Sequence, residues 1–241
     1  MKKHIPNLLT LSNLFCGAAG IVRCMEGYPT EAAYLIMLAA VFDFLDGFVA
    51  RMLRVSSPLG KELDSLADCI TFGVLPSMIM YTLMLRALST TGLDSKWAFT
   101  SLFMALFAAY RLAKFNIDTN QSEQFIGVPT PANALLIGSF PLIIAHNGFL
   151  ASYLQVFHFL GAITLLMSFL MTARLPLLAL KFKSFDWRTN YMRYVLILGS
   201  LVCLLLLRFD GIPAAIGLYV LISVFGKYKP SHSEKKPPAL S

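Results

Sequence analysis

The sequence predicts an all-α, polytopic membrane protein: a bundle of about eight transmembrane helices with both termini in the cytoplasm. Three observations support this fold class. Hydrophobic residues make up 57% of the 241 residues and charged residues only 14%, well below the roughly 25% that is usual in globular domains. The apolar residues gather into long segments, several of them close to the length of about 20 residues that a membrane-spanning helix needs. Basic residues fall mainly in alternate loops, as the positive-inside rule requires.

Eight apolar segments follow one another along the chain, and we expect each to form one membrane-spanning helix. They are residues 5–25, 30–51, 65–86, 97–115, 132–150, 153–174, 191–208 and 211–227. The first segment follows a basic start but has no clear small-residue cleavage site, so we interpret it as a retained span rather than a removable signal. The last segment is the shortest and begins near Gly211 and Pro213.

The distribution of lysine and arginine predicts the orientation of these spans. If the N-terminus is cytoplasmic and the spans alternate, most basic residues fall in cytoplasmic segments, and the opposite side holds only Arg23, Arg86, Lys96 and Arg208. This asymmetry indicates an even number of spans with both ends inside. The net charge of +7 is therefore explained by topology. No basic run is interleaved with aromatic residues in a soluble segment, so we expect no nucleic-acid partner.

Residues 1–229 are predicted to form a single transmembrane domain. Residues 230–241, which read PSHSEKKPPALS, are polar and proline-rich and cannot bury a core, so they are predicted to form a disordered cytoplasmic tail. The four cysteines form no CxxC pair and lie in or near apolar segments. They are typical of small hydrophobic residues and favour neither a disulfide framework nor a zinc site.

Four carboxylates lie inside or beside two of the apolar segments, where an ionised carboxylate is costly and indicates a functional site by default. They are Asp43, Asp46, Asp64 and Asp68. The first two are three positions apart and the last two are four positions apart, so each pair falls on one face of its helix. The intervening sequence Val55–Pro58 contains serines before a proline, which is a helix-start signal. Two helices joined by this short turn would bring both acidic faces together just inside the cytoplasmic surface.

Such a group of carboxylates predicts a metal site. Unpaired carboxylates packed together repel one another, and divalent cations relieve this repulsion. Oxygen ligands favour Mg²⁺, Mn²⁺ or Ca²⁺ over zinc, and two such ions about 4 Å apart can clamp a phosphoryl or pyrophosphoryl group during in-line displacement. Gly47, Ala50 and Gly60 leave room for a ligand beside the acids, and Arg51 is placed to meet a phosphate.

Two other interpretations of the acids compete with a metal site. Salt bridges to Arg51, Arg54 and Lys61 would be a purely structural explanation, but they do not account for four acids with three small residues in register. An ion-coupled membrane transporter is an alternative from another class, because intramembrane acids also serve transport. A transport path, however, needs polar groups spread over several spans, whereas these acids cluster at one turn.

The window Asp43–Asp68 resembles the signature of the CDP-alcohol phosphatidyltransferase family, D-x-x-D-G-x-x-A-R-x8-G-x-x-x-D-x-x-x-D. Every fixed position is present: Asp43, Asp46, Gly47, Ala50, Arg51, Gly60, Asp64 and Asp68. The resemblance implies a membrane enzyme that transfers the phosphatidyl group of CDP-diacylglycerol to an alcohol and releases CMP.

The same resemblance implies roles for individual residues. Asp43, Asp46 and Asp64 would hold two divalent ions, Mg²⁺ or Mn²⁺. Asp68 would be both a metal ligand and the general base, because an alcohol is a poor nucleophile at neutral pH without a base in hydrogen-bond reach, while metal charge stabilises the leaving phosphate. The implied CDP-lipid contacts are Asn7, Thr10, Gly47, Ala50, Arg51, Ser57 and Gly60. Asn7 is also explained as an ordinary residue at the start of a helix.

Three further stretches resemble the phosphatidylserine synthase branch of this family, which favours L-serine as the acceptor alcohol. They are NLFCG at 13–17, RLAKFN at 111–116 and FIGVPTP at 125–131. The resemblance places Arg111, Lys114 and Asn116 near the acceptor, and a guanidinium suits the planar carboxylate of serine. Anchoring of a helix end on the cytoplasmic side is the alternative explanation of the two basic residues.

Glycerol 3-phosphate or inositol phosphate stays open as an alternative acceptor, because five basic residues lie between positions 174 and 193 and could bind a second phosphate. The family resemblance also implies a homodimer. We expect the protein in the cell (inner) membrane, with its active site facing the cytoplasm, where CDP-lipid headgroups and serine meet.

Overall fold

The computed structural model describes residues 4–117, 125–173, 175–177 and 187–225, and in these ranges the chain is almost entirely helical. The α-helices are α1 (His4–Met25), α2 (Pro29–Leu53), α3 (Pro58–Asp68), α4 (Leu75–Leu88), α5 (Phe103–Ile117), α6 (Thr130–Ala145), α7 (Phe157–Thr172), α8 (Trp187–Leu207) and α9 (Gly211–Phe225). Shorter helical segments are η1 (Cys69–Val74), η2 (Ser95–Leu102), η3 (Tyr153–Gln155) and η4 (Arg208–Asp210). The predicted tail at 230–241 lies outside the described residues.

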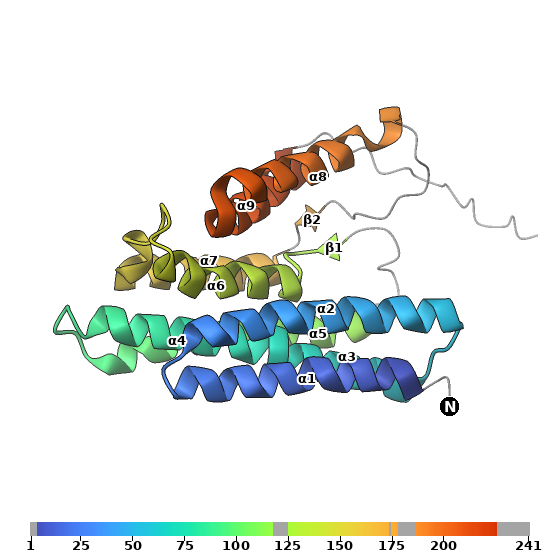
Figure 1. Cartoon of the computed structure of the whole chain (residues 1–241), viewed down its shortest axis with the longest axis horizontal. Coiled ribbons are helices and arrows are strands. Elements are labelled where there is room, and N and C mark those ends of the chain that lie inside the picture. Colours follow the sequence, from blue (N-terminus) through green and yellow to red (C-terminus); the bar gives the residue numbers. More distant parts are fainter. Residues whose placement is uncertain (1–3, 118–124, 174, 178–186, 226–241) are drawn as a thin grey trace, which may run out of the picture.

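The helices lie side by side in layers (Figure 1). Helices α1 to α5 form one part of the bundle, α6 and α7 lie next to it, and α8 and α9 form an outer antiparallel hairpin. Helix α6 is central, because it packs on α2 and α4 on one side and on α9 on the other. The apolar core lies where α2, α4 and α6 meet, around Ile36, Ile79 and Phe140.

The structure supports a multi-pass integral membrane protein. Among the described residues, five helical stretches are long and apolar enough to cross a membrane: His4–Met25, Pro29–Leu53, Pro58–Leu88, Ser95–Ile117 and Asn190–Val224. Two shorter apolar helices, α6 and α7, accompany them. Each of the eight predicted segments overlaps a helix, with the last two falling on α8 and α9 inside the longest stretch. The number of eight spans and the cytoplasmic location of both termini stay predictions.

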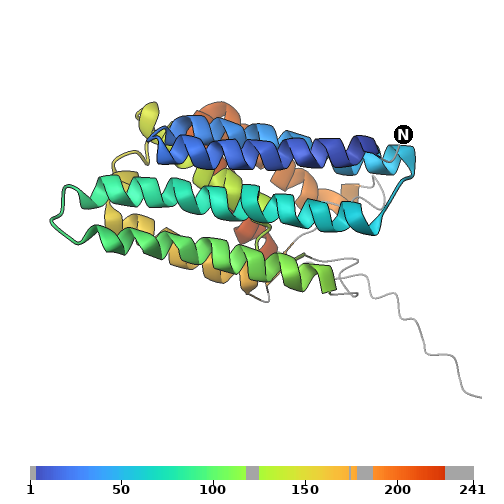
Figure 2. The same ribbon diagram turned by 90° about the horizontal axis from the view of Figure 1, so that it is seen from below.

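The third predicted segment is longer than expected. It was predicted to begin at residue 65, but α3, η1 and α4 form one continuous rod from Pro58 to Leu88, which lies between α1 and α5 (Figure 2). The rod begins with the predicted start signal: Ser57 is the N-cap, its hydroxyl accepts a hydrogen bond from the Gly60 N–H at 3.0 Å, and Pro58 follows in the first turn. The π-helical η1 directly after Asp68 is a feature often found at functional sites.

The predicted all-helical fold also contains one pair of two-residue strands. Phe125–Ile126 (β1) pairs antiparallel with Pro176–Leu177 (β2). Next to this pair, Gly127 N–H donates to the Leu175 carbonyl and Val128 N–H to the Leu170 carbonyl, both at 3.0 Å. The chain that enters α6 is thus tied to the chain that leaves α7. Partners about fifty residues away hold these short strands, so no local sequence pattern predicts them.

Candidate active site

The helices that carry the predicted site residues meet at one end of the bundle. The N-terminal end of α1 lies at the same end as the turn from α2 to α3 (Figures 1 and 2). Helix α2 ends at Arg54, whose left-handed backbone (φ 52°) reverses the chain, and the Val55 N–H then bonds back to the Ala50 carbonyl at 3.0 Å. The two acid-bearing helices therefore form an open hairpin, as the short turn predicts, and both pack on α1.

This hairpin brings together three of the four predicted acids. Asp43, Asp64 and Asp68 can place carboxylate oxygens within 4.8 Å of one another, and all three are partly buried. In the described part of the chain, no lysine or arginine forms a salt bridge with them. Ionised carboxylates this close repel one another, and three hard oxygen ligands suit a divalent cation such as Mg²⁺ or Mn²⁺. The three-carboxylate group could therefore hold a metal ion.

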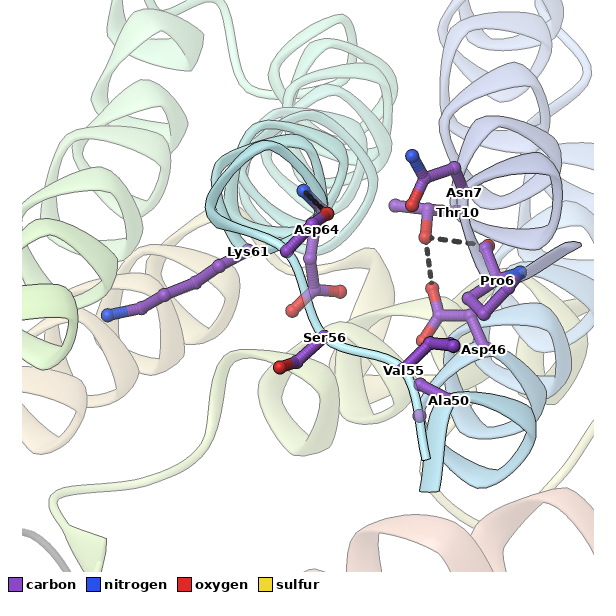
Figure 3. Close-up of a pocket in the computed structure, with 12 residues that line it drawn as sticks. Pro6, Asn7, Thr10, Asp46, Ala50, Val55, Ser56, Lys61 and Asp64 are labelled. Carbon is purple, nitrogen blue, oxygen red and sulfur yellow. Dashed lines mark hydrogen bonds between the residues drawn. The ribbon is translucent and has the colours of Figure 1, made fainter. Parts of the chain in front are cut away.

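Asp46 is not one of the three-carboxylate group but lies within electrostatic range of all three acids. It is buried, with 7% of its surface exposed, and its Oδ2 accepts a hydrogen bond from the Thr10 hydroxyl at 2.6 Å. The same Thr10 oxygen lies 3.1 Å from the Pro6 carbonyl (Figure 3). The hydroxyl ties the acid to α1, and the predicted role of Asp46 as a metal ligand stays a prediction.

Asn13, the first residue of the NLFCG stretch, is a site residue without a predicted role. Its side chain is fully buried, and its Nδ2 donates to Asp68 Oδ1 at 3.3 Å. The Asn13 backbone carbonyl accepts a hydrogen bond from Thr71 at 3.2 Å, which fixes α1 against η1. The available signal was a polar residue inside an apolar span, three positions after Thr10 and so on the same helix face.

A pocket of about 280 Å³ opens next to the acids (Figure 3). Most of the predicted CDP-lipid contacts line it, namely Asn7, Thr10, Gly47, Ala50, Ser57 and Gly60. Two of the acids, Asp46 and Asp64, line it as well. The pocket has four further lining residues that were not predicted to contact the nucleotide: Pro6, Val55, Ser56 and Lys61.

Gly60 leaves little space for a side chain at one wall of this pocket, and Arg51 lies at the edge of the pocket. A Cβ atom on Gly60 would come within 3.1 Å of Ser57 Oγ and 3.2 Å of Asn7 Oδ1. The predicted phosphate contact Arg51 does not line the pocket and is exposed. A Cβ atom built on Gly47 would lie 3.5 Å from Arg51 Nη1. The guanidinium therefore packs against α2 at Gly47, beside the pocket.

The three predicted acceptor residues on α5 face different neighbours. Arg111 Nη1 donates to the Thr130 hydroxyl of α6 at 3.5 Å and lies within electrostatic range of Asp68. The Asn116 side chain donates instead to Ser65 of α3 at 2.8 Å. Lys114 makes no hydrogen bond or salt bridge with any described residue. The structure therefore does not join these three side chains into one contact group.

Comparison with known proteins identifies the same family as the signature at Asp43–Asp68. The family model for CDP-alcohol phosphatidyltransferase matches residues 3–173. A Helicobacter pylori protein named CDP-diacylglycerol–serine O-phosphatidyltransferase is 36% identical over 222 residues, which cover 91% of this chain and 89% of the relative. A Bacillus subtilis protein of the same name is 36% identical over 158 residues, 64% of this chain and 86% of the relative. A Saccharomyces cerevisiae protein of that name is 34% identical over 150 residues, 56% of this chain and 52% of the relative.

The family match covers α1 to α7 and therefore includes the acidic hairpin and the pocket beside it. The identity to the Helicobacter pylori relative extends over most of both chains. The chain therefore belongs to the CDP-alcohol phosphatidyltransferase family and is a phosphatidyltransferase.

Proposed function

We propose that the protein transfers the phosphatidyl group of CDP-diacylglycerol to the hydroxyl of L-serine, giving phosphatidylserine and CMP. The observation that carries this proposal is the convergence of Asp43, Asp64 and Asp68 next to a pocket lined by the family signature. The names of the relatives support serine as the acceptor, and the stretches at 111–116 and 125–131 support the same choice.

The three-carboxylate group is proposed to hold the divalent metal, with Asp46 completing a site for two ions. Bound Mg²⁺ or Mn²⁺ would supply positive charge to the diphosphate of the CDP-lipid and so favour departure of CMP. Asp46 is kept in place by Thr10 from α1. The other oxygen, Oδ1, is the one proposed to meet an ion.

The pocket beside the acids is proposed to take the cytidine and diphosphate. Its volume of about 280 Å³ lies near the lower end of small-molecule pockets, which run from about 300 to 1,000 Å³. This size suits a nucleotide headgroup whose lipid chains remain in the bilayer. Gly47 and Gly60 allow a close approach of the ligand, and Ser57, Asn7 and the nearby Arg51 offer polar contacts.

Asp68 is proposed to act as the general base on the acceptor. The serine hydroxyl would attack the phosphorus attached to the diacylglycerol, the bond from this phosphorus to CMP would break, and the hydroxyl proton would pass to Asp68. Asn13 holds Asp68 Oδ1 through its amide, and the proton is proposed to pass to the other oxygen.

Arg111 is proposed to bind the serine carboxylate, because it is the predicted acceptor residue that lies within electrostatic range of Asp68. Lys114 and Asn116 lie further along α5, and the Asn116 contact with Ser65 supports a role in holding α5 against α3. With the acids and these residues at one end of the bundle, we propose that this end faces the cytoplasm, as the loop charges predict.

A transfer assay tests this function directly. Purified protein in mixed micelles is incubated with CDP-diacylglycerol, Mn²⁺ or Mg²⁺, and labelled L-serine, and both CMP and labelled lipid are measured. We expect equal amounts of the two products, and neither product after chelation of the metal. Product formation only with glycerol 3-phosphate or inositol phosphate would keep the transferase and reject serine. Substrate flux in liposomes without CMP release would support a transporter instead.

A further inference from the structure

A buried group of polar side chains on α5 and α6 lies outside the lining of the nucleotide pocket. Thr130 and Asn133 of α6 are fully buried, and Arg111 of α5 reaches Thr130 through its Nη1. Both amide atoms of Asn133 and the Nε of Arg111 are buried without a hydrogen-bond partner among the described residues. Buried polar groups in an apolar bundle normally find partners. This group therefore has donors and an acceptor available for a polar ligand.

Tyr219 connects the outer hairpin to this group. It lies on α9, and it lines a cavity of about 550 Å³ together with Pro129 and Ala132 at the start of α6. Thr130, the hydrogen-bond partner of Arg111, lies between Pro129 and Ala132 in the sequence. Tyr219 and Arg111 are also within electrostatic range of each other. Helix α9 therefore reaches the guanidinium predicted to bind the acceptor.

Helix geometry places Asn133 between these two neighbours. With 3.6 residues per turn, successive residues of α6 point about 100° apart. Asn133 therefore projects between the direction of Thr130, which meets Arg111, and that of Ala132, which meets the cavity lined by Tyr219. The Oδ1 and Nδ2 of its amide, which have no hydrogen-bond partner among the described residues, therefore lie on the side of α6 between these two contacts.

We propose that Asn133 and Tyr219 complete the acceptor pocket around Arg111, with Asn133 contacting the amino acid and Tyr219 positioning the guanidinium. This inference rests on the proposed function. A zwitterionic amino acid brings both a carboxylate and an ammonium group into a region of low dielectric constant. Arg111 supplies donors only, whereas an asparagine amide supplies a donor and an acceptor, so the pair can satisfy both ends of serine.

This pocket extends beyond the part of the chain that matches the family model. The family model ends at residue 173, and Tyr219 comes from the hairpin beyond it. The acceptor site of this chain would then depend on α9 as well as on the part that matches the family. The hairpin would contribute to the choice of acceptor without touching the nucleotide pocket.

Two substitutions test the pocket by separating the KM for serine from the KM for CDP-diacylglycerol. Asn133→Leu keeps the size of the side chain and removes the unpaired amide. We expect at least a tenfold higher KM for serine, an unchanged KM for CDP-diacylglycerol, and equal or higher thermal stability in detergent. Tyr219→Phe removes one hydroxyl, and we expect a rise of about threefold to tenfold in the KM for serine alone. Tyr110→Phe, an exposed tyrosine on the same helix as Arg111, is the matched control and should change neither constant.

The outcomes separate this inference from the function on which it rests. If the wild-type protein uses serine but both variants keep its KM within twofold, Asn133 and Tyr219 are structural and the inference is wrong. If the wild-type protein uses another alcohol, serine is rejected. The same KM measurement is then made with that alcohol, where an increase in both variants supports the pocket and no increase overturns it. A rise in the KM for CDP-diacylglycerol together with the KM for the acceptor would also overturn the inference, because it would indicate a general distortion of the site.

Discussion

Asn13 of α1 donates its side-chain amide to Asp68 Oδ1 at the end of α3, 55 positions later in the chain, at a distance of 3.3 Å. This bond connects the first span to the carboxylate that the family signature assigns as the base. Because Asn13 is fully buried and its own backbone carbonyl is bonded to Thr71, the amide is held by α1 and η1 together. The orientation of Asp68 therefore depends on a residue outside the signature.

Replacing Asp68 by asparagine should strongly slow turnover while leaving the shape of the site intact. A positioned base contributes roughly 10²- to 10⁴-fold to a rate, so we expect the kcat of Asp68→Asn to fall by that factor. CMP should still bind, because the pocket residues are unchanged, and calorimetry measures this binding. Glu62→Gln, an exposed acid on the same helix, should keep full activity. An Asp68→Asn enzyme with normal turnover would remove Asp68 from the mechanism.

Loss of the Asn13 amide should slow the reaction without weakening nucleotide binding. A small displacement of a catalytic group can cost about 100-fold in rate, and Asn13→Ala releases only one oxygen of Asp68. We therefore expect kcat to fall by roughly tenfold to 100-fold with little change in the KM for CDP-diacylglycerol. Ser12→Ala, one position away with its hydroxyl on its own helix carbonyl, is the control. Equal kcat values for Asn13→Ala and Ser12→Ala would show that the amide does not orient the base.

A methyl group on Gly60 should narrow the pocket and weaken CDP-lipid binding. The added Cβ would meet Ser57 Oγ at 3.1 Å and Asn7 Oδ1 at 3.2 Å, and both belong to the pocket wall. We expect Gly60→Ala to raise the KM for CDP-diacylglycerol severalfold and to leave the KM for the acceptor nearly unchanged. Gly161→Ala on α7 adds a methyl group where no atom lies within 4 Å and should alter neither constant. If the two variants behave alike, close approach at Gly60 plays no part in binding.

Gly127 should be the most sensitive of the glycines with a positive φ angle. Its φ is +75°, and an added Cβ would collide with the Met171 carbonyl oxygen. An Ala residue forced into an incompatible backbone conformation destabilises a protein by more than about 1 kcal/mol. Gly92 also has a positive φ (+71°), but no atom lies within 4 Å of an added Cβ. The Gly92→Ala variant therefore measures the cost of the backbone strain without a steric clash. A thermal unfolding series in detergent should show a larger loss for Gly127→Ala. A loss equal to that of Gly92→Ala would mean that the chain around β1 can move aside.

Local sequence patterns predicted the helical elements and the meeting of three of the four acids. The apolar segments coincide with helices because lipid requires every spanning segment to satisfy its own backbone hydrogen bonds. The Ser57–Pro58 start of α3 and the convergence of Asp43 with Asp64 and Asp68 follow from spacing within one hairpin. These features depend on residues close together in the chain, so a pattern of charge and hydrophobicity is enough to find them.

The features that the sequence did not reveal depend on contacts across the chain. The bond from Asn13 to Asp68 and the pairing of β1 with β2 join residues about fifty positions apart. The divergence of Arg111 toward α6 and Asn116 toward α3 was also hidden, because it depends on which helix packs on each face of α5.

Binding of Mn²⁺ to the purified protein, followed by electron paramagnetic resonance of the free ion, tests the central claim that Asp43, Asp64 and Asp68 hold the metal. The wild-type protein should bind Mn²⁺ and bind it more tightly in the presence of CDP-diacylglycerol. We predict that Asp43→Asn and Asp64→Asn each weaken this binding at least tenfold, about 1.4 kcal/mol, and that Glu62→Gln binds like the wild type. Wild-type affinity in Asp43→Asn and Asp64→Asn would contradict the assignment of a metal site to the three-carboxylate group.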